Sequence, residues 1–457
     1  MLLARRAHAH GSSARLKVYG CVLLVVVLAF VQRLWFIRAG LVVNPMIGDA
    51  VQYCDYAWNL VQSHVFSLSP PGSENVVPDN YRDPGYPLFL AAWLVLWGSG
   101  DPWYHAVLFV QAVLGALSAG VAMLTAMQWL GLRIAFFVGM AVALWPHSVS
   151  ISGFLLSETL FGFVVLVSIG FLAMASRSAS KVPWAIAGLS FGAASLVNAT
   201  LTPFCPLLAV VLMARRAAPR PLLLTLMIAS LVMPLAWSAR TRILPDGPSA
   251  GSRVMTNLVQ GSWADYHSAY IKALFGDVPA KAVMSDMDSD IALAVKSPED
   301  WLSVLATRIR QDPVHYIAWY AWKPYLLWAW NIRVGAGDVY PYPVAHPIYR
   351  TYLVMRLFES ICAALNPLLF ALMVGGVWIV LTRPAKSAAT IALYAMSALI
   401  AYETLVYSLL QAEPRYSIPF RPLEIMLAAT AMTWIVSFIQ KRRTASGRVG
   451  DGSGDAS

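Results

Sequence analysis

Long apolar runs separated by short charged segments dominate the pattern of the chain. A helix needs about 20 mostly apolar residues to cross the hydrocarbon core of a bilayer. The stretch 183–214 is too long for one helix and is interrupted by Asn198, Pro203 and Pro206, so we expect two short helices meeting at this break. The other long runs predict membrane-spanning helices at 18–37, 104–129, 134–150, 154–175, 221–240, 356–382, 388–411 and 417–439.

Two further apolar stretches are ambiguous. Residues 84–97 would form a helix of about 21 Å, which is shorter than the hydrocarbon core. Residues 315–331 contain Lys323 and Pro324 and are rich in Trp and Tyr, a composition typical of the membrane interface. If neither stretch crosses, the clusters of Lys and Arg fall on the cytoplasmic side, as the positive-inside rule requires. The pattern predicts an all-α polytopic membrane protein with about 10–12 transmembrane helices.

This topology divides the chain into one membrane-embedded domain, 1–443, and a tail, 444–457, whose Gly, Ser and Asp content predicts disorder. The loops 38–103 and 241–350 then face outside. Apolar residues recur at helical spacing in 49–62, which predicts an amphipathic interfacial helix in the first loop. In the second loop, the sequence from Ser297 to Asp312 carries helix start and stop signals.

The composition supports a membrane protein and argues against a nucleic-acid-binding protein, a disulfide-rich protein and a zinc-binding domain. Of the 457 residues, 58% are hydrophobic and 12% are charged, against roughly a quarter charged in soluble domains. The net charge of +10 does not predict nucleic-acid binding, because Lys and Arg lie in short clusters between apolar runs. The four cysteines form no CxxC pair, so a disulfide framework or a zinc knuckle is not expected. Basic residues precede the first apolar run without a small-residue cleavage site, which predicts an uncleaved signal anchor.

Few polar residues stand where they could carry chemistry. Asp49 opens the first outer loop, either as a functional acid or as a cap of the helix 49–62. Arg82 and Asp83 precede a rigid Pro-Gly turn and can form a salt bridge with each other. Glu158 lies near the outer end of an apolar helix, where an ionisable group is either functional or reaches water. His147, near a neighbouring helix end, could join Glu158 in a metal site or be an ordinary polar residue.

Four motifs in order resemble those of the C-type membrane glycosyltransferases, a superfamily that includes protein O-mannosyltransferases and the bacterial lipid A aminoarabinose transferase. The first combines an acid after the first helix, a Tyr four residues later, and Arg-x-Pro-Gly-Tyr-Pro at 82–87. The others are Ser-Glu-Thr-Leu-Phe at 157–161, Trp-Ser-Ala-Arg at 237–240 and Pro-Arg-Tyr at 414–416. The chain departs from the pattern at Asn198, where an Arg is expected, and at Thr241, where Asn often follows the Arg.

The resemblance implies transfer of a sugar from a polyprenyl-phosphate donor to a hydroxyl of a glycan, lipid or protein acceptor. It implies an outward-facing site, which we expect in a bacterial inner membrane, and inversion at the anomeric carbon. Asp49 would accept the acceptor's proton, and arginines would stabilise the charge on the departing lipid phosphate. The residues expected to bind substrate are Tyr53, Arg82, Tyr86, Glu158, Arg240, Arg415 and Tyr416. No cofactor is certain, and a divalent metal held by His147 and Glu158 is left open.

Two other functions predict different features. A transporter or flippase of lipid-linked sugars would need paired broken helices and a site at mid-membrane, whereas the sequence shows one broken segment. A glycan polymerase or ligase would work on the same face with a different acceptor. Asp286 and Asp288 form the Asp-x-Asp that holds metal and nucleotide in soluble glycosyltransferases. Without a glycine-rich phosphate loop beside it, we interpret this segment as a solvated acidic stretch.

Overall fold

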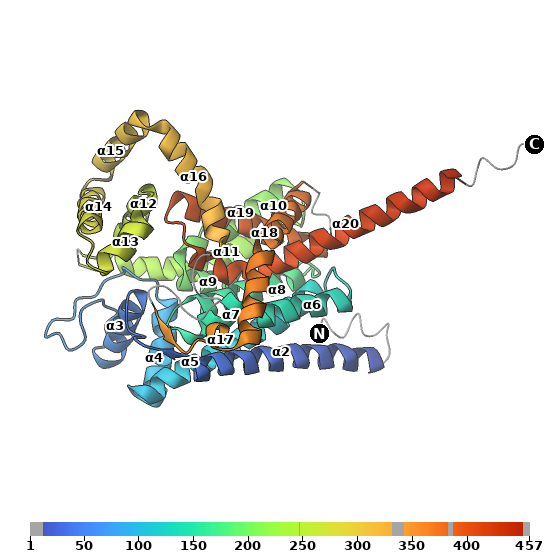
Figure 1. Ribbon diagram of the computed structural model, residues 1–457, viewed down its shortest axis with the longest axis horizontal. Helices are drawn as coiled ribbons and strands as arrows, with labels where there is room; N and C mark the ends of the chain where they lie inside the picture. Colours follow the sequence, from blue (N-terminus) through green and yellow to red (C-terminus); the bar gives the residue numbers. More distant parts are fainter. Residues whose placement is uncertain (1–11, 246, 331–341, 383–386, 451–457) are drawn as a thin grey trace, which may run out of the picture.

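The long helices of the chain lie side by side in a bundle (Figure 1). The computed structural model describes residues 12–245, 247–330, 342–382 and 387–450. Within these ranges seven helices are long and apolar enough to cross a membrane, which confirms the all-α polytopic membrane fold. They are α2 (Ser12–Ala39), α5 (Asp101–Ala126), α8 (Glu158–Ala175), α11 (Arg220–Thr241), α18 (Leu353–Leu381), α19 (Ala388–Leu409) and α20 (Arg421–Gly450).

One predicted helix is broken. Residues 134–150 were expected to be continuous, but α6 (Leu132–Leu144) and α7 (Pro146–Ser150) meet at a bend of 54°. Pro146 disfavours the helical conformation of the residue before it, and Trp145 accordingly has ψ 121°. Counting the bent pair, which η1 (Ile151–Gly153) continues, as one span gives eight candidates in the described residues. The predicted total of 10–12 crossings stays a prediction.

The remaining apolar helices are shorter. The expected break at Asn198 is confirmed, because α9 (Lys181–Val197) ends there and η2 (Ala199–Leu201) leads into α10 (Phe204–Ala214). The ambiguous stretch 84–97 forms α4 (Gly85–Trp97). α4 packs against the end of α9, and a Cβ on Gly85 would lie 2.8 Å from the backbone of Leu196. This close approach fixes the turn 82–85 beside the break in the α9–α10 segment.

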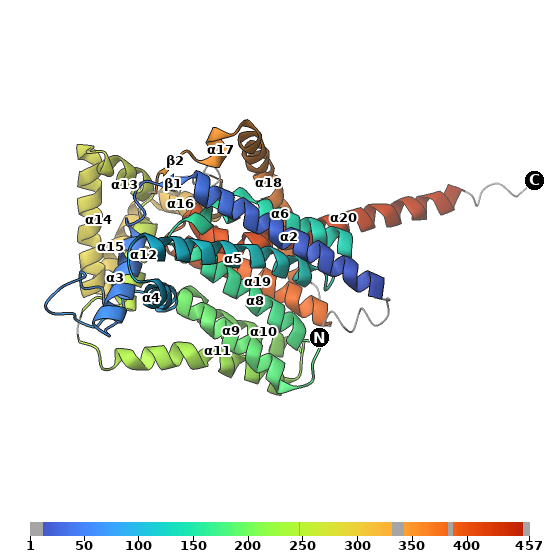
Figure 2. The same ribbon diagram turned by 90° about the horizontal axis from the view of Figure 1, so that it is seen from below.

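A group of helices covers one end of the bundle (Figure 2). Most of them belong to the second predicted loop, and α3 (Asp49–Gln62) belongs to the first. Val259, Met287 and Trp301 form a separate small core within the second loop, so this loop is folded as predicted. Asp286 and Asp288 lie on its exposed surface. The helices of the second loop are α12 (Ala250–Ser262), α13 (Tyr266–Leu274), α14 (Val278–Lys296), α15 (Pro298–Gln311) and α16 (Pro313–Trp328).

Two short elements connect distant segments near the same end. β1 (Leu41–Val42) pairs antiparallel with β2 (Val344–Ala345), with Leu41 opposite Ala345. This pair joins the chain after α2 to the chain before α17 (Ile348–Thr351) and α18. After the C-terminal end of α19, η3 (Pro414–Phe420) turns the chain into α20. The consequence is that residues near positions 49, 342 and 415 meet.

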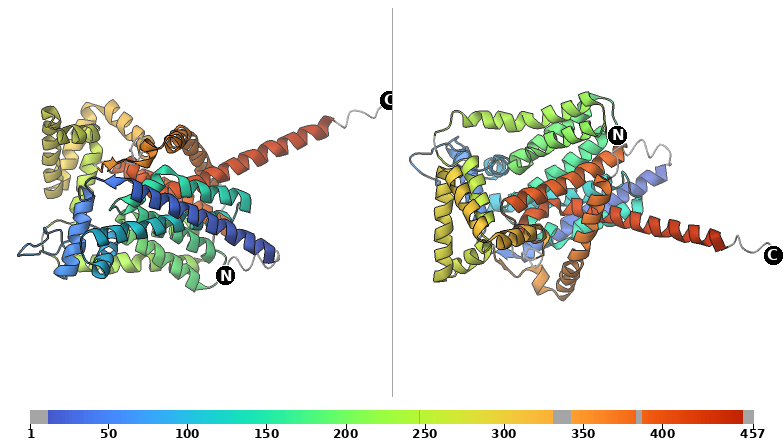
Figure 3. Two further views of the ribbon diagram at one scale, coloured as in Figure 1. Left: turned by 60° about the horizontal axis from the view of Figure 1, so that its bottom comes forward. Right: turned by 90° about the horizontal axis from the view of Figure 1, so that it is seen from above.

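The C-terminal helix is longer than expected. α20 continues to Gly450 and projects away from the bundle (Figure 3), so 444–450 of the predicted disordered tail are helical. Adding residues to an existing helix requires no new nucleation, and no proline interrupts this segment. Residues 451–457 lie outside the described residues.

Candidate active site

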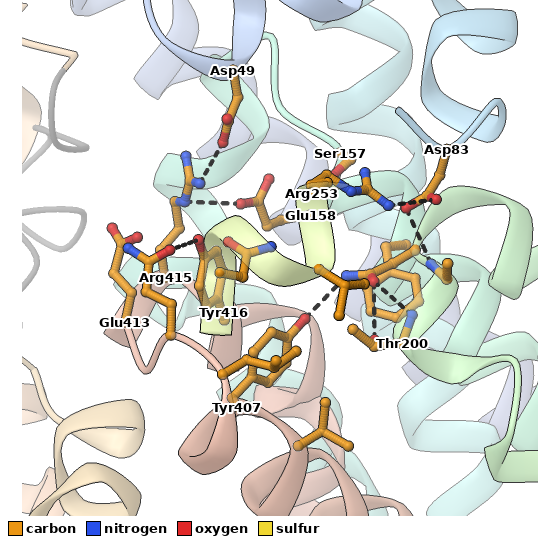
Figure 4. Close-up of a pocket in the computed structure, with 18 of the residues that line it drawn as sticks. Asp49, Asp83, Ser157, Glu158, Thr200, Arg253, Tyr407, Glu413, Arg415 and Tyr416 are labelled. Atoms are coloured by element: carbon orange, nitrogen blue, oxygen red, sulfur yellow. Dashed lines mark hydrogen bonds and ion pairs between the residues drawn. The ribbon is translucent and has the colours of Figure 1, made fainter. Parts of the chain in front are cut away.

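A cavity of about 460 Å³ lies where α3, α8, α12, α19 and η3 converge (Figure 4). Its volume falls within the usual range for small-molecule sites. Most of its lining is polar or aromatic, including three arginines and four acids. The predicted site residues in the lining are Asp49, Tyr53, Arg82, Glu158, Arg415 and Tyr416.

The backbone at the start of α3 holds Asp49 in place. Gly48 has φ 55° and ψ −127°, a conformation that side chains with a Cβ rarely adopt. Tyr342, buried beside the β1–β2 pair, accepts a hydrogen bond from the Ala50 N–H and donates one to the Ile47 carbonyl, 2.6 Å away. The chain turns sharply before Asp49, and its carboxylate is directed into the cavity.

Asp49 is bound by two arginines. Its Oδ1 lies 2.6 Å from Arg82 Nη2, and its Oδ2 lies 2.6 Å from Arg415 Nη2. Gln52, one turn along α3, accepts a hydrogen bond from Arg82 Nε at 2.6 Å. Burial disfavours the charged carboxylate, but Arg82 and Arg415 outweigh burial and hold the pKa of Asp49 below its usual range. Because α3 begins without a side-chain cap, Asp49 is better described as part of an ion-pair network.

Glu158, the first residue of α8, joins the same network. Its Oε1 lies 3.2 Å from Arg415 Nε, while its buried Oε2 has no hydrogen-bond partner among the described residues. Arg415 therefore lies between two carboxylates. The preceding residue, Ser157, is 3.4 Å from Tyr53 Oη, and the Arg82 guanidinium lies over the Tyr53 ring. The first and second sequence motifs meet here.

A second ion pair lies at a separate place in the cavity. Asp83 Oδ1 is 2.7 Å from Arg253 Nη2 of α12, and its Oδ2 accepts a hydrogen bond from the Ala199 N–H. The expected bridge between Arg82 and Asp83 is therefore wrong, because these neighbours leave the chain in different directions and find different partners. Figure 4 shows Asp83 and Arg253 apart from Asp49 and Arg415.

Neutral polar groups complete the lining. The Tyr416 ring stacks on Tyr407 with centroids 4.9 Å apart, and its hydroxyl donates to Gln411 Oε1 at 3.3 Å. Asn198, which stands where the motif has an Arg, donates from Nδ2 to Tyr407 Oη at 3.0 Å. The departure from the motif therefore places an amide, bonded to an aromatic hydroxyl, where a cation was expected.

Two predicted site residues do not line the cavity. Tyr86 is fully buried, donates to Gln111 Oε1 at 2.9 Å, and packs edge-on against Tyr53. Arg240 binds backbone carbonyls of the first loop, those of Asp79 at 2.7 Å and Phe66 at 3.1 Å. Both residues support the loop that carries the site. The two contacts of Arg240 engage both Nη atoms of its guanidinium group.

The predicted metal candidates are not brought together. His147 packs on the Trp330 ring, with centroids 4.0 Å apart, and does not line the cavity. No three His, Cys, Asp or Glu side chains in the described part of the chain form a metal-binding group. Asp49 and Glu158 approach each other, but the Arg415 guanidinium lies between them. The side chains do not fit a metal, and we derive no step through one.

Sequence reasoning missed the contribution of α12. Arg253, Thr256, Asn257 and Gln260 line the cavity, and they recur at the 3–4 residue spacing of one helix face. The signal was present in the sequence as polar residues alternating with apolar ones. It could not be connected to the site without knowing how the second loop folds over it.

Comparison with known proteins supports the fold. No protein-family model and no curated protein sequence matches the chain. Among solved structures, the oligosaccharyltransferase AglB from Archaeoglobus fulgidus, bound to an inhibitory peptide and a dolichol-phosphate, aligns with 96% of this chain and 53% of its own, at 12% identity and TM-score 0.50. A second structure of the archaeal enzyme, with Zn and sulfate, aligns with 93% of this chain and 51% of its own, at 13% identity and TM-score 0.50. The chain thus spans about half the length of these structures.

A third structure, ArnT from Cupriavidus metallidurans bound to undecaprenyl phosphate, aligns with 93% of this chain and 78% of its own, at 14% identity. The TM-score of this alignment is 0.38. The archaeal structures have low sequence identity to this chain, and the similarity between them is one of fold. The chain shares the fold of these archaeal oligosaccharyltransferase structures, which agrees with the fold that the motif resemblance implied.

Proposed function

We propose that this protein transfers a sugar from a polyprenyl-phosphate donor to an acceptor hydroxyl, at the outer face of a bacterial inner membrane. The observation that carries the proposal is the binding of Asp49 by Arg82 and Arg415 inside a cavity of substrate size. A carboxylate can accept the proton of an attacking hydroxyl. Two arginines beside it can hold the phosphate that leaves. The archaeal structures with this fold, which include an oligosaccharyltransferase in complex with a dolichol-phosphate, support the same class of donor.

The reaction is a single displacement. The acceptor oxygen forms a bond to the anomeric carbon as the bond from that carbon to the phosphate oxygen breaks, and the bonding pair leaves with the lipid phosphate. The acceptor proton passes to Asp49. The phosphate gains negative charge as it departs, so fixed guanidinium groups lower the barrier most in the transition state. Attack opposite the leaving group inverts the anomeric centre.

The ion pairs of Asp49 give the donor a second role. With Arg82 and Arg415 bound to it, the carboxylate is ionised but is a weak base, because its pKa is lowered. A donor phosphate competes for the same guanidinium groups. As they turn to the phosphate, Asp49 loses the partners that lower its pKa and becomes a stronger base. Asp49 is therefore a strong base only while the donor is bound.

The test compares Asp49→Asn with a matched control, Asp288→Asn, on the exposed surface of α14. Purified protein is supplied with radiolabelled polyprenyl-phosphate sugars, and donor binding and sugar transfer are measured separately. We expect Asp49→Asn to lose roughly two orders of magnitude or more in transfer, as for loss of a general base. It should bind the donor at least as tightly as the wild type, because two arginines are released for phosphate. Asp288→Asn should match the wild type.

Equal transfer by Asp49→Asn and wild type would contradict the assigned base. If the wild type binds the lipid and moves it between leaflets without releasing its sugar, the chain is a lipid-linked sugar transporter instead.

A further inference from the structure

α12 uses both of its faces. Met255, Leu258 and Val259 pack into the small core of the second loop, which fixes the rotation of the helix about its axis. The opposite face then meets the cavity, and its residues there are Arg253, Thr256, Asn257 and Gln260. Because the rotation is set by packing, this polar face is a built wall of the cavity.

The two amides of this wall have free hydrogen-bonding capacity. Among the described residues, the side chains of Asn257 and Gln260 have no hydrogen-bond partner, while Asn198 and Gln411 elsewhere in the lining are bonded to tyrosines. A carboxamide offers two donors and an acceptor. Adjacent sugar hydroxyls present the complementary set, so the free amides suit a polyhydroxylated ligand.

The charged residues on α12 indicate which class of sugar the wall can bind. Arg253 is the one charged residue between Ala250 and Ser262, and Asp83 pairs with it. The wall is therefore electrically neutral. An amino sugar would find no unpaired carboxylate on this wall, and a uronic acid would find no unpaired cation. An uncharged hexose or N-acetylhexosamine would lose no ionic hydration on binding and could bond to both amides.

We propose that the polar face of α12 binds the sugar of the donor, and that this sugar is uncharged. The proposal rests on the proposed function and adds to it the recognition element and the substrate class. In this arrangement Asp49, Arg82 and Arg415 act at the anomeric carbon and phosphate. Asn257 and Gln260 contact hydroxyl or acetamido groups farther round the ring and decide which donor is used.

The test uses Asn257→Ala and Gln260→Ala, with Gln311→Ala as the matched control on the exposed end of α15. Each full-length variant is assayed with polyprenyl-phosphate donors carrying a hexose, an N-acetylhexosamine, an amino sugar or a uronic acid. Sugar-free polyprenyl phosphate is used as a competitive inhibitor. Loss of one or two hydrogen bonds to the sugar should raise the KM for the preferred donor about fivefold or more. The inhibition constant of the sugar-free lipid should stay unchanged.

The outcomes separate this proposal from the proposed function. If the wild type transfers an uncharged sugar and only the α12 variants lose donor affinity, both stand. If the wild type transfers sugar but Asn257→Ala and Gln260→Ala behave like Gln311→Ala, the α12 wall is not the sugar site. An equal rise in the sugar-free lipid's inhibition constant, or preference for a charged sugar, also overturns it. Absence of transfer from every donor overturns both.

Discussion

Nη2 of Arg415 lies 2.6 Å from Oδ2 of Asp49, although 366 positions separate the two residues in the sequence. The same guanidinium lies 3.2 Å from Oε1 of Glu158. Arg415 therefore pairs with two acids that belong to different motifs, and Arg82 pairs with Asp49 as well. Without Arg415, Asp49 would keep only Arg82 and Glu158 would lose this cation, so repulsion between the two carboxylates would act on both the fold and the reaction.

We expect Arg415→Gln to lose both stability and transfer. The variant leaves the buried Glu158 without its cation and Asp49 with Arg82 alone, which costs about 3 kcal/mol or more of unfolding free energy. Loss of the phosphate contact lowers kcat by roughly 10²-fold or more. Thermal unfolding in detergent and steady-state transfer measure the two effects. The double variant Arg415→Gln with Glu158→Gln should regain part of the stability and none of the kcat. Recovery of transfer in that variant would argue against a role for Arg415 at the phosphate.

The pH dependence should report the pairing of Asp49. Its folded-state pKa lies below the unfolded value, so its contribution to stability is present above the unfolded pKa and is lost as pH falls through the folded pKa. Arg82→Gln removes one of the two cations. The acid limb of kcat/KM should then move to higher pH, and the acid loss of stability that Asp49 causes should be smaller and complete at a higher pH than in the wild type. An unmoved limb would mean that Asp49 is not the titrating group.

The acid limb of kcat should differ from that of kcat/KM in the wild type. The kcat/KM profile reports the free enzyme and the kcat profile the donor complex. If the donor phosphate draws Arg82 and Arg415 away, the pKa of Asp49 in the complex is higher than in the free enzyme. The limb of kcat is expected at the higher pH, and coincident limbs would contradict activation of the base by the donor.

Much of the fold could be predicted because hydrophobic periodicity and length define helices locally. The site was harder, because it depends on contacts between distant segments. Asp49, Arg82, Glu158 and Arg415 were found through motifs, and the structure brings these four together. Arg253 was missed, because only the folding of the second loop places it beside Asp83.

Arg240 was expected to bind substrate, and the structure places it outside the cavity lining. Its position at a helix end suggested a contact with the donor phosphate, yet the guanidinium group of Arg240 donates to the Asp79 and Phe66 carbonyls. We therefore expect Arg240→Gln to leave the KM for the donor within about threefold of the wild type, since no substrate contact is lost. The first loop should be cleaved faster by a protease, because its anchor is lost. Arg82→Gln serves as the comparison and should raise the KM strongly. A comparable rise in Arg240→Gln would restore Arg240 to the phosphate site.

The attachment of α12 to the bundle should control activity from outside the cavity. Lys323, fully buried on α16, donates to the Gly261 carbonyl at 2.8 Å and to the Leu410 carbonyl at 2.6 Å, so it joins the end of α12 to the end of α19. Gly261 has no room for a side chain, because a Cβ there would lie 1.8 Å from the Leu410 oxygen.

Lys323→Met keeps the length of the side chain and removes both donors, which should cost roughly 2 kcal/mol or more of unfolding free energy. Gly261→Ala should displace α12 by steric contact in a protein that still has the lysine at position 323. If α12 is the sugar-binding wall, both variants should raise the KM for the donor and leave inhibition by sugar-free polyprenyl phosphate little changed. Loss of stability with an unchanged KM would show that the position of α12 does not matter for the sugar.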